Sequence, residues 1–426
     1  MDNTREIQNA IDHCYRNNSG KLIAILTQLF GPSNLELAED VVHDAMVEAL
    51  NNWQQKGIPG NPAAWLMRTA KNKALNIIRR DKYKFEYAHN QLYLLQNGWT
   101  AESFIEEMFT EREIKDELLR MMFVCCHPDI GKEAQVTLIL KTLCGFSIAE
   151  IARAYLTTEA TISKRLVRAR QTIRELDIAF EIPANENLQQ RVDAVLETIY
   201  LLFNEGYSST EGDVLIRFDI CEEAIRLCKI LGEHPAGNNS STWSLLSLMC
   251  LNASRFNARV AKEGNAILLH EQDRSLWNRE LIRAGLKYLE AAAGLGIINT
   301  YYIQAAISAC HCIAPDYEQT NWTEILNLYN LLIKIDNSPV VLLNRVVALS
   351  KIHGQQAALN ELDSMAITGT LENYYPFYAV KGELLMELSR WKEAKANFEK
   401  ARSLTLNQQE QDLLSQKIIV CADHVI

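Results

Sequence analysis

The sequence predicts an all-α protein made of more than one helical domain. Apolar residues recur three and four positions apart along most of the chain, which is the spacing of one helix face. Strand-like alternation is scarce, and only nine of the 426 residues are proline, the residue that most strongly interrupts a helix. The chain is too long for one ordinary core, so we expect two or three domains.

Charge is distributed unevenly along the chain. The formal net charge is −10, yet residues 1–180 contain 22 basic and 23 acidic residues, whereas residues 181–426 contain 21 and 30. The acidity therefore belongs to the second half. The first half contains two basic segments and two acidic ones, at 68–84, 164–174, 36–48 and 102–117. Such alternation suggests partners of both charge signs.

The ten cysteines predict reduced, buried thiols in a cytoplasmic protein, because no CxxC pair occurs and several lie within apolar helical patterns. Cys125-Cys126-His127 and Cys310-His311-Cys312 offer metal-binding residue types, but neighbouring helix positions point in different directions and no second ligand pair stands at a useful spacing. We expect no metal and no cofactor. No apolar run approaches the ~20 residues of a membrane span, so no membrane contact is expected.

The first predicted domain covers residues 1–87. Its helix at 34–53 is followed by a break at 56–60, after which Asn61 is a helix N-cap and Pro62 the first helical residue. Residues 88–112 have weaker periodicity and are interpreted as a linker.

A second domain is predicted at 113–180. Gly145 ends one helix, and Ser147 with Glu150 has the S-x-x-E form of a capping box that opens the next. A short turn at 156–158 then leads into another helix, so this segment is a predicted helix-turn-helix. Residues 182–185 mark a further boundary.

Residues 186–426 form the third predicted domain, an α-solenoid. One tetratricopeptide-like unit has small and aromatic residues at the expected spacing, namely Gly382, Leu385, Trp391, Ala394, Phe398 and Ala401. Ala358 stands 36 residues before Ala394 in a weaker copy. A generic helical bundle would leave a similar pattern.

The helix after the turn divides into two faces. Ile162, Leu166, Ala169 and Ile173 share one face and are expected to pack inward. The opposite face and its flanks consist of Thr161, Lys164, Arg168 and Gln171, with Ser163, Arg165, Arg170 and Arg174 beside them. Solvated faces usually mix acidic with basic residues, whereas this one has five bases and no acid. We therefore favour DNA binding, with base contacts first and phosphate contacts farther along.

Two other surfaces are candidates for binding. In 61–84, aromatic, amide and cationic residues recur at three and four, a composition that can hold an unstacked base, although Trp65 could equally be a core residue. In 35–53, Glu36, Glu39, Asp40, Asp44 and Glu48 surround an apolar stripe of Leu37, Val41, Ala45 and Leu50. That acidic ridge is either a solvated face or a dock for a basic protein partner.

Three segments resemble, in this order, regions 2.2, 2.3 to 2.4 and 4.2 of an RNA polymerase sigma factor of the extracytoplasmic-function (ECF) type. They read "AEDVVHDAMVEALNNW", "NPAAWLMRTAKNKALNIIRRDK" and "FSIAEIARAYLTTEATISKRLVRARQTIREL". The later segments "YLLFNEGYSSTEG", "LLHEQDRSLWNRELI" and "SPVVLLNRVVAL", and "CCHP" before the helix-turn-helix, resemble the ECF subgroup with a tetratricopeptide-like C-terminal extension. The resemblance covers nearly the whole chain.

The resemblance implies three sets of site residues. Binding to the clamp coiled coil of polymerase would use Asp40, His43, Asp44 and Glu48, and the polymerase flap is a further expected contact. The −10 promoter element would contact Trp65, Arg68, Thr69, Asn72, Asn76, Arg79 and Arg80. The −35 element would contact Thr161, Ser163, Lys164, Arg165, Arg168 and Gln171. The chain departs from the family pattern at His43, which replaces a common glutamine, and at Leu156 and Ala160, which replace frequent turn residues.

The C-terminal domain is interpreted as a regulatory module acting in cis, with a protein or ligand as a candidate partner. Its Glu205-Gly206-Tyr207 and Asp273-Arg274 clusters either bind a ligand or cap helices and form a buried ion pair. A tetratricopeptide-type adaptor, or a DNA-binding repressor that acts without polymerase, is the alternative function. No nucleophile–base pair, phosphate loop or metal spacing supports an enzyme.

Overall fold

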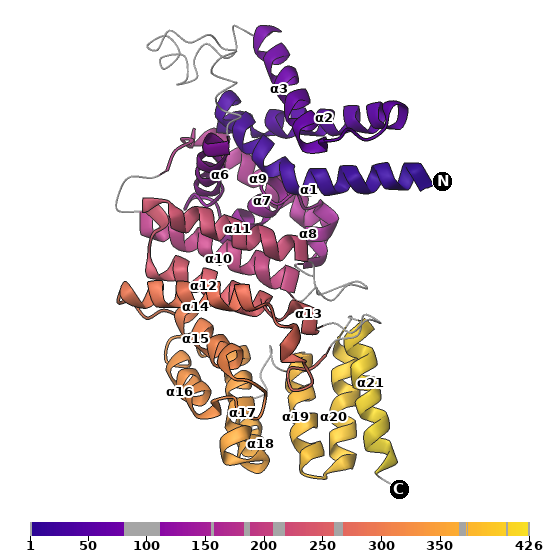
Figure 1. Ribbon diagram of the computed structural model, residues 1–426, viewed down its shortest axis with the longest axis vertical. Coiled ribbons are helices and arrows are strands. Elements are labelled where there is room, and N and C mark those ends of the chain that lie inside the picture. Colours follow the sequence, from indigo (N-terminus) through magenta and orange to yellow (C-terminus); the bar gives the residue numbers. More distant parts are fainter. Residues whose placement is uncertain are drawn as a thin grey trace. The chain divides into compact units, whose positions relative to one another are not determined.

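The computed structural model describes residues 2–80, 111–154, 157–182, 188–207, 218–259, 267–365, 372, 374–405 and 408–424. Every long element within these residues is an α-helix (Figure 1), which confirms the predicted all-α fold. The chain divides into two compact units, Met1–Leu202 and Phe203–Ile426. Most of the predicted linker, Leu156 of the predicted turn and the boundary at 183–185 lie outside the described residues.

The first unit begins with three long helices, α1 (Asp2–Phe30), α2 (Leu35–Lys56) and α3 (Pro62–Arg80), which pack on one another. A short 3-10 turn, η1 (Pro32–Asn34), connects α1 to α2. Glycines at the ends of α1 and α2, Gly31 and Gly57, adopt positive φ angles of 83° and 81°, which residues with a side chain rarely do. The Asn61 side chain accepts a hydrogen bond from the Ala64 amide at 3.0 Å, as expected of the N-cap of α3.

Four further helices of the first unit are α6 (Glu111–Cys125), α7 (Lys132–Thr142), α8 (Ile148–Ala154) and α9 (Glu159–Glu175). Gly145 follows α7 with a φ of 68°. The Ser147 amide donates to the Glu150 carboxylate at 2.8 Å, and the Glu150 amide donates to the Ser147 hydroxyl at 3.1 Å. This reciprocal pair is the predicted capping box, and it fixes the start of α8.

Helix α10 (Leu188–Tyr207) begins in the first unit and ends in the second. In its first half, the Arg191 guanidinium donates to the Phe123 carbonyl of α6 and lies over the Phe123 ring. Glu197 pairs with Lys132 of α7 at 3.2 Å. The start of α10 is therefore held to the same helices that precede α8 and α9.

The second unit continues as a series of helices. They are α11 (Phe218–Glu233), α12 (Ser240–Ala253), α13 (Phe256–Arg259), α14 (Arg279–Gly294), α15 (Thr300–Ile313), α16 (Trp322–Leu332), α17 (Pro339–His353), α18 (Gln355–Ser364), α19 (Tyr375–Glu387), α20 (Trp391–Leu404) and α21 (Gln408–Asp423), with the 3-10 turns η2 (Pro235–Gly237) and η3 (Arg274–Leu276). From α14 to α21, each helix packs against the next one in the sequence. Short connections between such neighbours make consecutive helices antiparallel.

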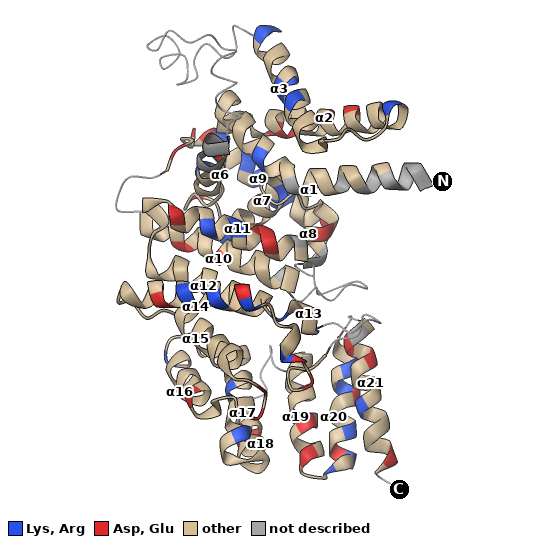
Figure 2. Ribbon diagram, in the orientation of Figure 1, with Lys and Arg blue, Asp and Glu red and all other residues tan. Residues whose placement is uncertain are grey.

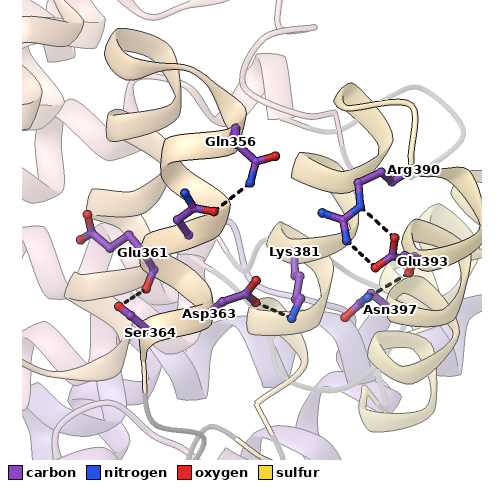
Figure 3. Close-up of polar contacts among 9 residues, drawn as sticks. Gln356, Glu361, Asp363, Ser364, Lys381, Arg390, Glu393 and Asn397 are labelled. Atoms are coloured by element: carbon purple, nitrogen blue, oxygen red, sulfur yellow. Dashed lines mark hydrogen bonds and ion pairs between the residues drawn. The ribbon is translucent and has the colours of Figure 1, made fainter.

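The last helices contain the predicted tetratricopeptide-like residues. Ala394, Phe398 and Ala401 are fully buried in one apolar cluster with Leu385, and Trp391 packs against its edge. Gly382 of α19 faces the Phe398 ring of α20. In Figure 3, Lys381 of α19 reaches Asp363 of α18, at a distance of 2.6 Å, so an ion pair connects one helical pair to the next.

Asp273 and Arg274 each make hydrogen bonds within the second unit. The Asp273 carboxylate is exposed and accepts a hydrogen bond from the Ser275 amide at the start of η3. The buried Arg274 guanidinium donates to the carbonyls of His311 and Ala314, at 2.6 and 2.7 Å, and to the Thr320 hydroxyl. The expected cap is present. Arg274 makes no ion pair with a described residue, because carbonyl and hydroxyl oxygens accept its hydrogen bonds instead.

Candidate nucleic-acid interface

Helix α3 presents a basic and polar face. At 100° per residue, all seven residues proposed for the −10 element fall within a sector of about 120°. Five of them are exposed, namely Arg68, Asn72, Asn76, Arg79 and Arg80. Leu66, Ala70 and Ala74 are buried on the other side of the helix. Figure 2 shows basic residues along α3. This face can offer guanidinium groups to phosphates and amide groups to base edges.

The other two residues of this set, Trp65 and Thr69, are partly or wholly inside. Trp65 is half-buried, and its ring meets the fully buried Trp53 edge to face, with centroids 5.7 Å apart. Thr69 is 8% exposed, and its hydroxyl donates to the Trp65 carbonyl at 2.9 Å. Trp65 therefore packs against the core on one side and is accessible on the other, whereas Thr69 is buried and bonds to the backbone of its own helix.

Helix α2 presents the acidic ridge beside α3. Asp40, His43, Asp44 and Glu48 are all exposed. Glu48 is joined to Lys73 of α3 by an ion pair of 2.9 Å. Val47 lies among these residues and is 45% exposed. An apolar centre within a polar rim is a common composition of protein-binding surfaces, and the sequence pattern did not single out Val47.

Helix α9 divides as predicted. Ile162, Leu166, Ala169 and Ile173 are the buried residues of the helix. Lys164, Arg168 and Gln171 are exposed, whereas Thr161, Ser163 and Arg165 are half-buried. The Thr161 amide and hydroxyl both contact the Thr158 hydroxyl, which caps the helix. The polar face of α9 therefore faces solvent on a firmly capped helix.

Three arginines on the flanks of α9 are engaged within the first unit. Arg165 pairs with Glu133 of α7. Arg170 reaches Glu39 of α2 at 2.6 Å, and Arg174 reaches Glu36 of α2 at 3.3 Å. The ends of α2 and α9 are therefore bound to each other, a contact that the sequence analysis missed because its partners are 131 and 138 positions apart.

Burial affects the charges at this contact. The Arg170 and Glu39 side chains are only 15% and 18% exposed. Burial raises the pKa of Glu39, although Arg170 and Lys141 act to lower it. Burial also lowers the pKa of Lys141. Arg170 Nε and Glu39 Oε1 are buried without a hydrogen-bond partner, so the pair is only half satisfied.

The cysteine and histidine clusters form no metal centre among the described residues. All ten thiols are free and nine are buried. Burial raises the pKa of Cys126 to about 12, and burial lowers the pKa of His311 to about 3. Such groups are a neutral thiol and a neutral imidazole near pH 7. No helix in the described part of the chain combines the length and the apolar character needed to cross a membrane.

Two family models match parts of the chain. Residues 14–83 match the family model of sigma-70 region 2. Residues 191–293 match a family of unknown function, DUF6596. The match over residues 14–83 supports a sigma factor role in transcription initiation, and a sigma region 2 implies binding of core RNA polymerase and promoter DNA.

One relative matches most of the chain. The uncharacterized protein R00370 of Rhizobium meliloti (strain 1021) is 37% identical over 378 residues, which are 88% of each protein. With this identity and coverage, the chain belongs to the same family as the rhizobial protein. No solved structure matches the chain significantly.

Proposed function

We propose that the chain is a sigma factor of the ECF type that recognises two promoter elements and carries its own regulatory module. The α2 ridge of Asp40, His43, Asp44 and Glu48 would dock on the clamp coiled coil of core polymerase. The α3 face would hold the −10 element, and α9 would read the −35 element. The tetratricopeptide-like second unit would modulate activity in cis.

The observation that carries the proposal is the α3 face within the matched region 2. Five exposed cationic and amide residues and the half-buried Trp65 share one side of a helix whose other side is core. Opening DNA requires unstacking at a few kcal/mol per base, which stacking and amide contacts offset. Arg68, Arg79 and Arg80 would supply the salt-dependent attraction to phosphates.

Helix α9 supports the second DNA contact. It follows α8 after a short connection, Ile162, Leu166, Ala169 and Ile173 are buried, and Lys164, Arg168 and Gln171 are exposed. A helix with this division can enter the major groove with Thr161, Ser163, Lys164 and Arg165 near the base edges. Arg168 and Gln171 would then lie along the phosphates.

Polymerase would make the two contacts effective together. Each DNA-binding module alone has a small interface and correspondingly modest affinity. Docking both on one enzyme raises the effective concentration of the second module once the first is bound. The acidic ridge with Val47 supports this role, because its charge is opposite to that of a DNA-binding surface and its centre is apolar.

Run-off transcription with purified core polymerase tests the proposal. The chain is added to core enzyme with a library of promoter fragments from its own genome, and transcripts of defined length are expected. Two variants distinguish polymerase binding from promoter opening. Asp44→Lys is expected to prevent binding to core enzyme. Asn76→Ala is expected to leave that binding intact and to weaken promoter opening. Failure on every fragment with active core enzyme would contradict the proposal, and DNA binding without polymerase would favour the repressor alternative.

A further inference from the structure

Three arginine side chains of the second unit meet around one tryptophan and one tyrosine. Arg255 Cζ lies 5.8 Å and Arg274 Cζ 4.9 Å from the centre of the Trp277 ring. Arg255 Nη2 also donates to the Tyr207 hydroxyl at 2.8 Å. Arg259 Nη1 donates to the Tyr207 carbonyl at 2.8 Å, and its Cζ lies 3.8 Å from the centre of the Tyr207 ring. These contacts define an arginine cluster, formed by Arg255, Arg259 and Arg274.

The arginine cluster forms no ion pair with a carboxylate of the described residues. All three side chains donate to hydroxyl and carbonyl oxygens instead. Two other arginines of the same unit are half-buried like Arg255, and both have acidic partners: Arg226 pairs with Glu223, and Arg345 pairs with Glu361. The three positive charges of the cluster therefore lack the compensation that other half-buried arginines of this unit have.

Burial makes this uncompensated charge costly. Arg274 is 7% exposed, and Arg255 and Arg259 are half-buried. Burial lowers the pKa of Arg259 and of Arg274, and the charge of Arg255 adds to the fall at both. Asp316 attracts Arg274, but its carboxylate is exposed to water. Like charges repel more strongly in the protein than in water, so an anion bound among the arginines would remove a cost of folding.

Two buried donors of the cluster lack an acceptor. Arg255 Nε and Trp277 Nε1 are buried and have no hydrogen-bond partner among the described residues. The whole Trp277 side chain is only 2% exposed. An indole N–H and a guanidinium N–H can only donate, so both require an acceptor. Buried donors of native proteins are nearly always bonded, and an unpartnered one indicates a site for an ion or a water molecule.

We propose that Arg255 and Arg259 bind a phosphate group, with Trp277 Nε1 as a neutral donor beside them. Phosphate monoesters have a charge of about −1.5 to −2 at pH 7 and three strong acceptor oxygens, whereas a carboxylate has one charge and two oxygens. Guanidinium groups match phosphate geometry with paired N–H donors. Arg274 adds positive charge, while its own hydrogen bonds hold the surrounding backbone.

The burial of the cluster limits the size of the ligand. Arg255 and Arg259 keep part of their surface accessible, whereas Trp277 is almost fully enclosed. A small group can therefore reach the donors, and we assign the site to phosphate that is free or esterified to a small organic molecule. The site belongs to the second unit and does not depend on the proposed function.

Isothermal titration calorimetry of the full-length chain tests the site. Inorganic phosphate and glycerol phosphate are titrated separately at constant ionic strength, and acetate is the singly charged comparison. We expect one phosphate site per chain and weaker binding of acetate. Tighter binding of inorganic phosphate would identify the free anion as the ligand, whereas tighter binding of glycerol phosphate would identify a phosphate ester. If neither phosphate compound binds saturably, or if acetate binds as tightly, the proposal is wrong.

Substitutions locate the binding residues. Arg255→Gln and Arg259→Gln each remove a charged donor and are expected to weaken phosphate binding about tenfold or more. Arg255→Lys keeps the charge but loses the paired donors, so an intermediate affinity is expected. Arg402→Gln, at an exposed position of α20, is the matched control and should bind phosphate like the native chain. Unchanged affinity in the two cluster variants, or an equal loss in the control, would contradict the proposal.

Hydrogen exchange of the native chain gives a test that requires no substitution. Saturating phosphate is expected to slow amide exchange most in the segments that contain the cluster, 254–259 and 274–278, because a ligand that binds only the folded site opposes its local opening. This measurement decides the question if circular dichroism shows that an arginine variant does not fold. Protection confined to other segments would place the anion elsewhere and overturn the proposal.

Discussion

Gly382 of α19 and Phe398 of α20 touch so closely that no side chain fits between them: a Cβ atom on Gly382 would lie 2.6 Å from Cε1 of the Phe398 ring. Phe398 is itself fully buried among Leu385, Ala394 and Ala401. The close approach of these helices therefore depends on the missing side chain at Gly382.

Gly382→Ala is expected to destabilise the second unit by about 1–3 kcal/mol, because the methyl group forces the packed aromatic ring to move. Urea unfolding followed by circular dichroism measures the change. The control is Gly294→Ala at the end of α14, where nothing lies within 4 Å of the added carbon. Equal stability of the two variants would show that the helices can separate freely at Gly382.

The stability of the isolated first unit is expected to depend on the residue at which the chain is truncated. A chain ending at residue 187 loses α10, and with it the Arg191 bond to the Phe123 carbonyl and the Glu197–Lys132 ion pair. A chain ending at residue 207 keeps both contacts. We expect faster hydrogen exchange in α6 and α7 for the shorter chain, and indistinguishable protection would contradict a structural role of α10. Tests of the regulatory role should therefore use the longer form.

Arg168 on the exposed side of α9 is expected to contribute affinity without sequence preference. Arg168→Gln removes one phosphate contact, so the slope of log affinity against log salt should fall in magnitude by about 1. Lys164→Ala should instead change the preference at one base pair by about 1–3 kcal/mol. Holoenzyme binding to promoter fragments at several salt concentrations measures both effects. Lys229→Gln, on α11 of the second unit, is the control, and the same loss there would show that net charge alone is responsible.

The first unit is expected to gain stability from Glu39 as the pH falls. Burial raises the pKa of Glu39 despite Arg170 of α9 and Lys141 of α7, and Glu36 of α2 adds to the rise. Tyr15 of α1 also faces Glu39, and its own pKa is raised by burial. A raised pKa means that the folded unit binds the proton more tightly than the unfolded chain, in which the carboxylate is solvated.

This pH dependence is opposite to that of a carboxylate whose pKa is lowered by a salt bridge. The contribution of Glu39 is fully present below its ordinary pKa of 4.5 and is lost as the pH rises through the raised value. Between about pH 7 and about pH 5, the free energy of unfolding of the native chain should therefore rise relative to that of Glu39→Gln, as urea unfolding measures. A relative fall on acidification would contradict the prediction.

Features set by neighbouring residues could be predicted from the sequence. The Ser147–Glu150 capping box and the buried face of α9 depend on residues within one or a few helical turns, so the periodicity of the sequence contains them. The tight contact at Gly382 followed in the same way from a small residue opposite an aromatic one.

Features set by residues far apart could not be predicted in this way. The partners of Arg170 and Arg274 depend on how separate helices meet, and the Arg170–Glu39 contact joins positions 131 residues apart. The sequence suggested an acidic partner for Arg274, but its donors are satisfied by carbonyl oxygens and a hydroxyl group. Helix periodicity gives the direction of a side chain on its own helix, and it contains no information about which helix lies opposite.

The edge-to-face pair of Trp53 and Trp65 gives the proposed −10 surface an optical signal of its own. Trp53 is held in the core, whereas Trp65 keeps an accessible side on the face that we propose to hold a captured base. An unpaired base that stacks beside an indole quenches its fluorescence, so DNA opening on this surface can be followed in real time without an added dye. Replacing Trp65 with phenylalanine would leave the packing partner of Trp53 aromatic and remove the signal that reports the captured base.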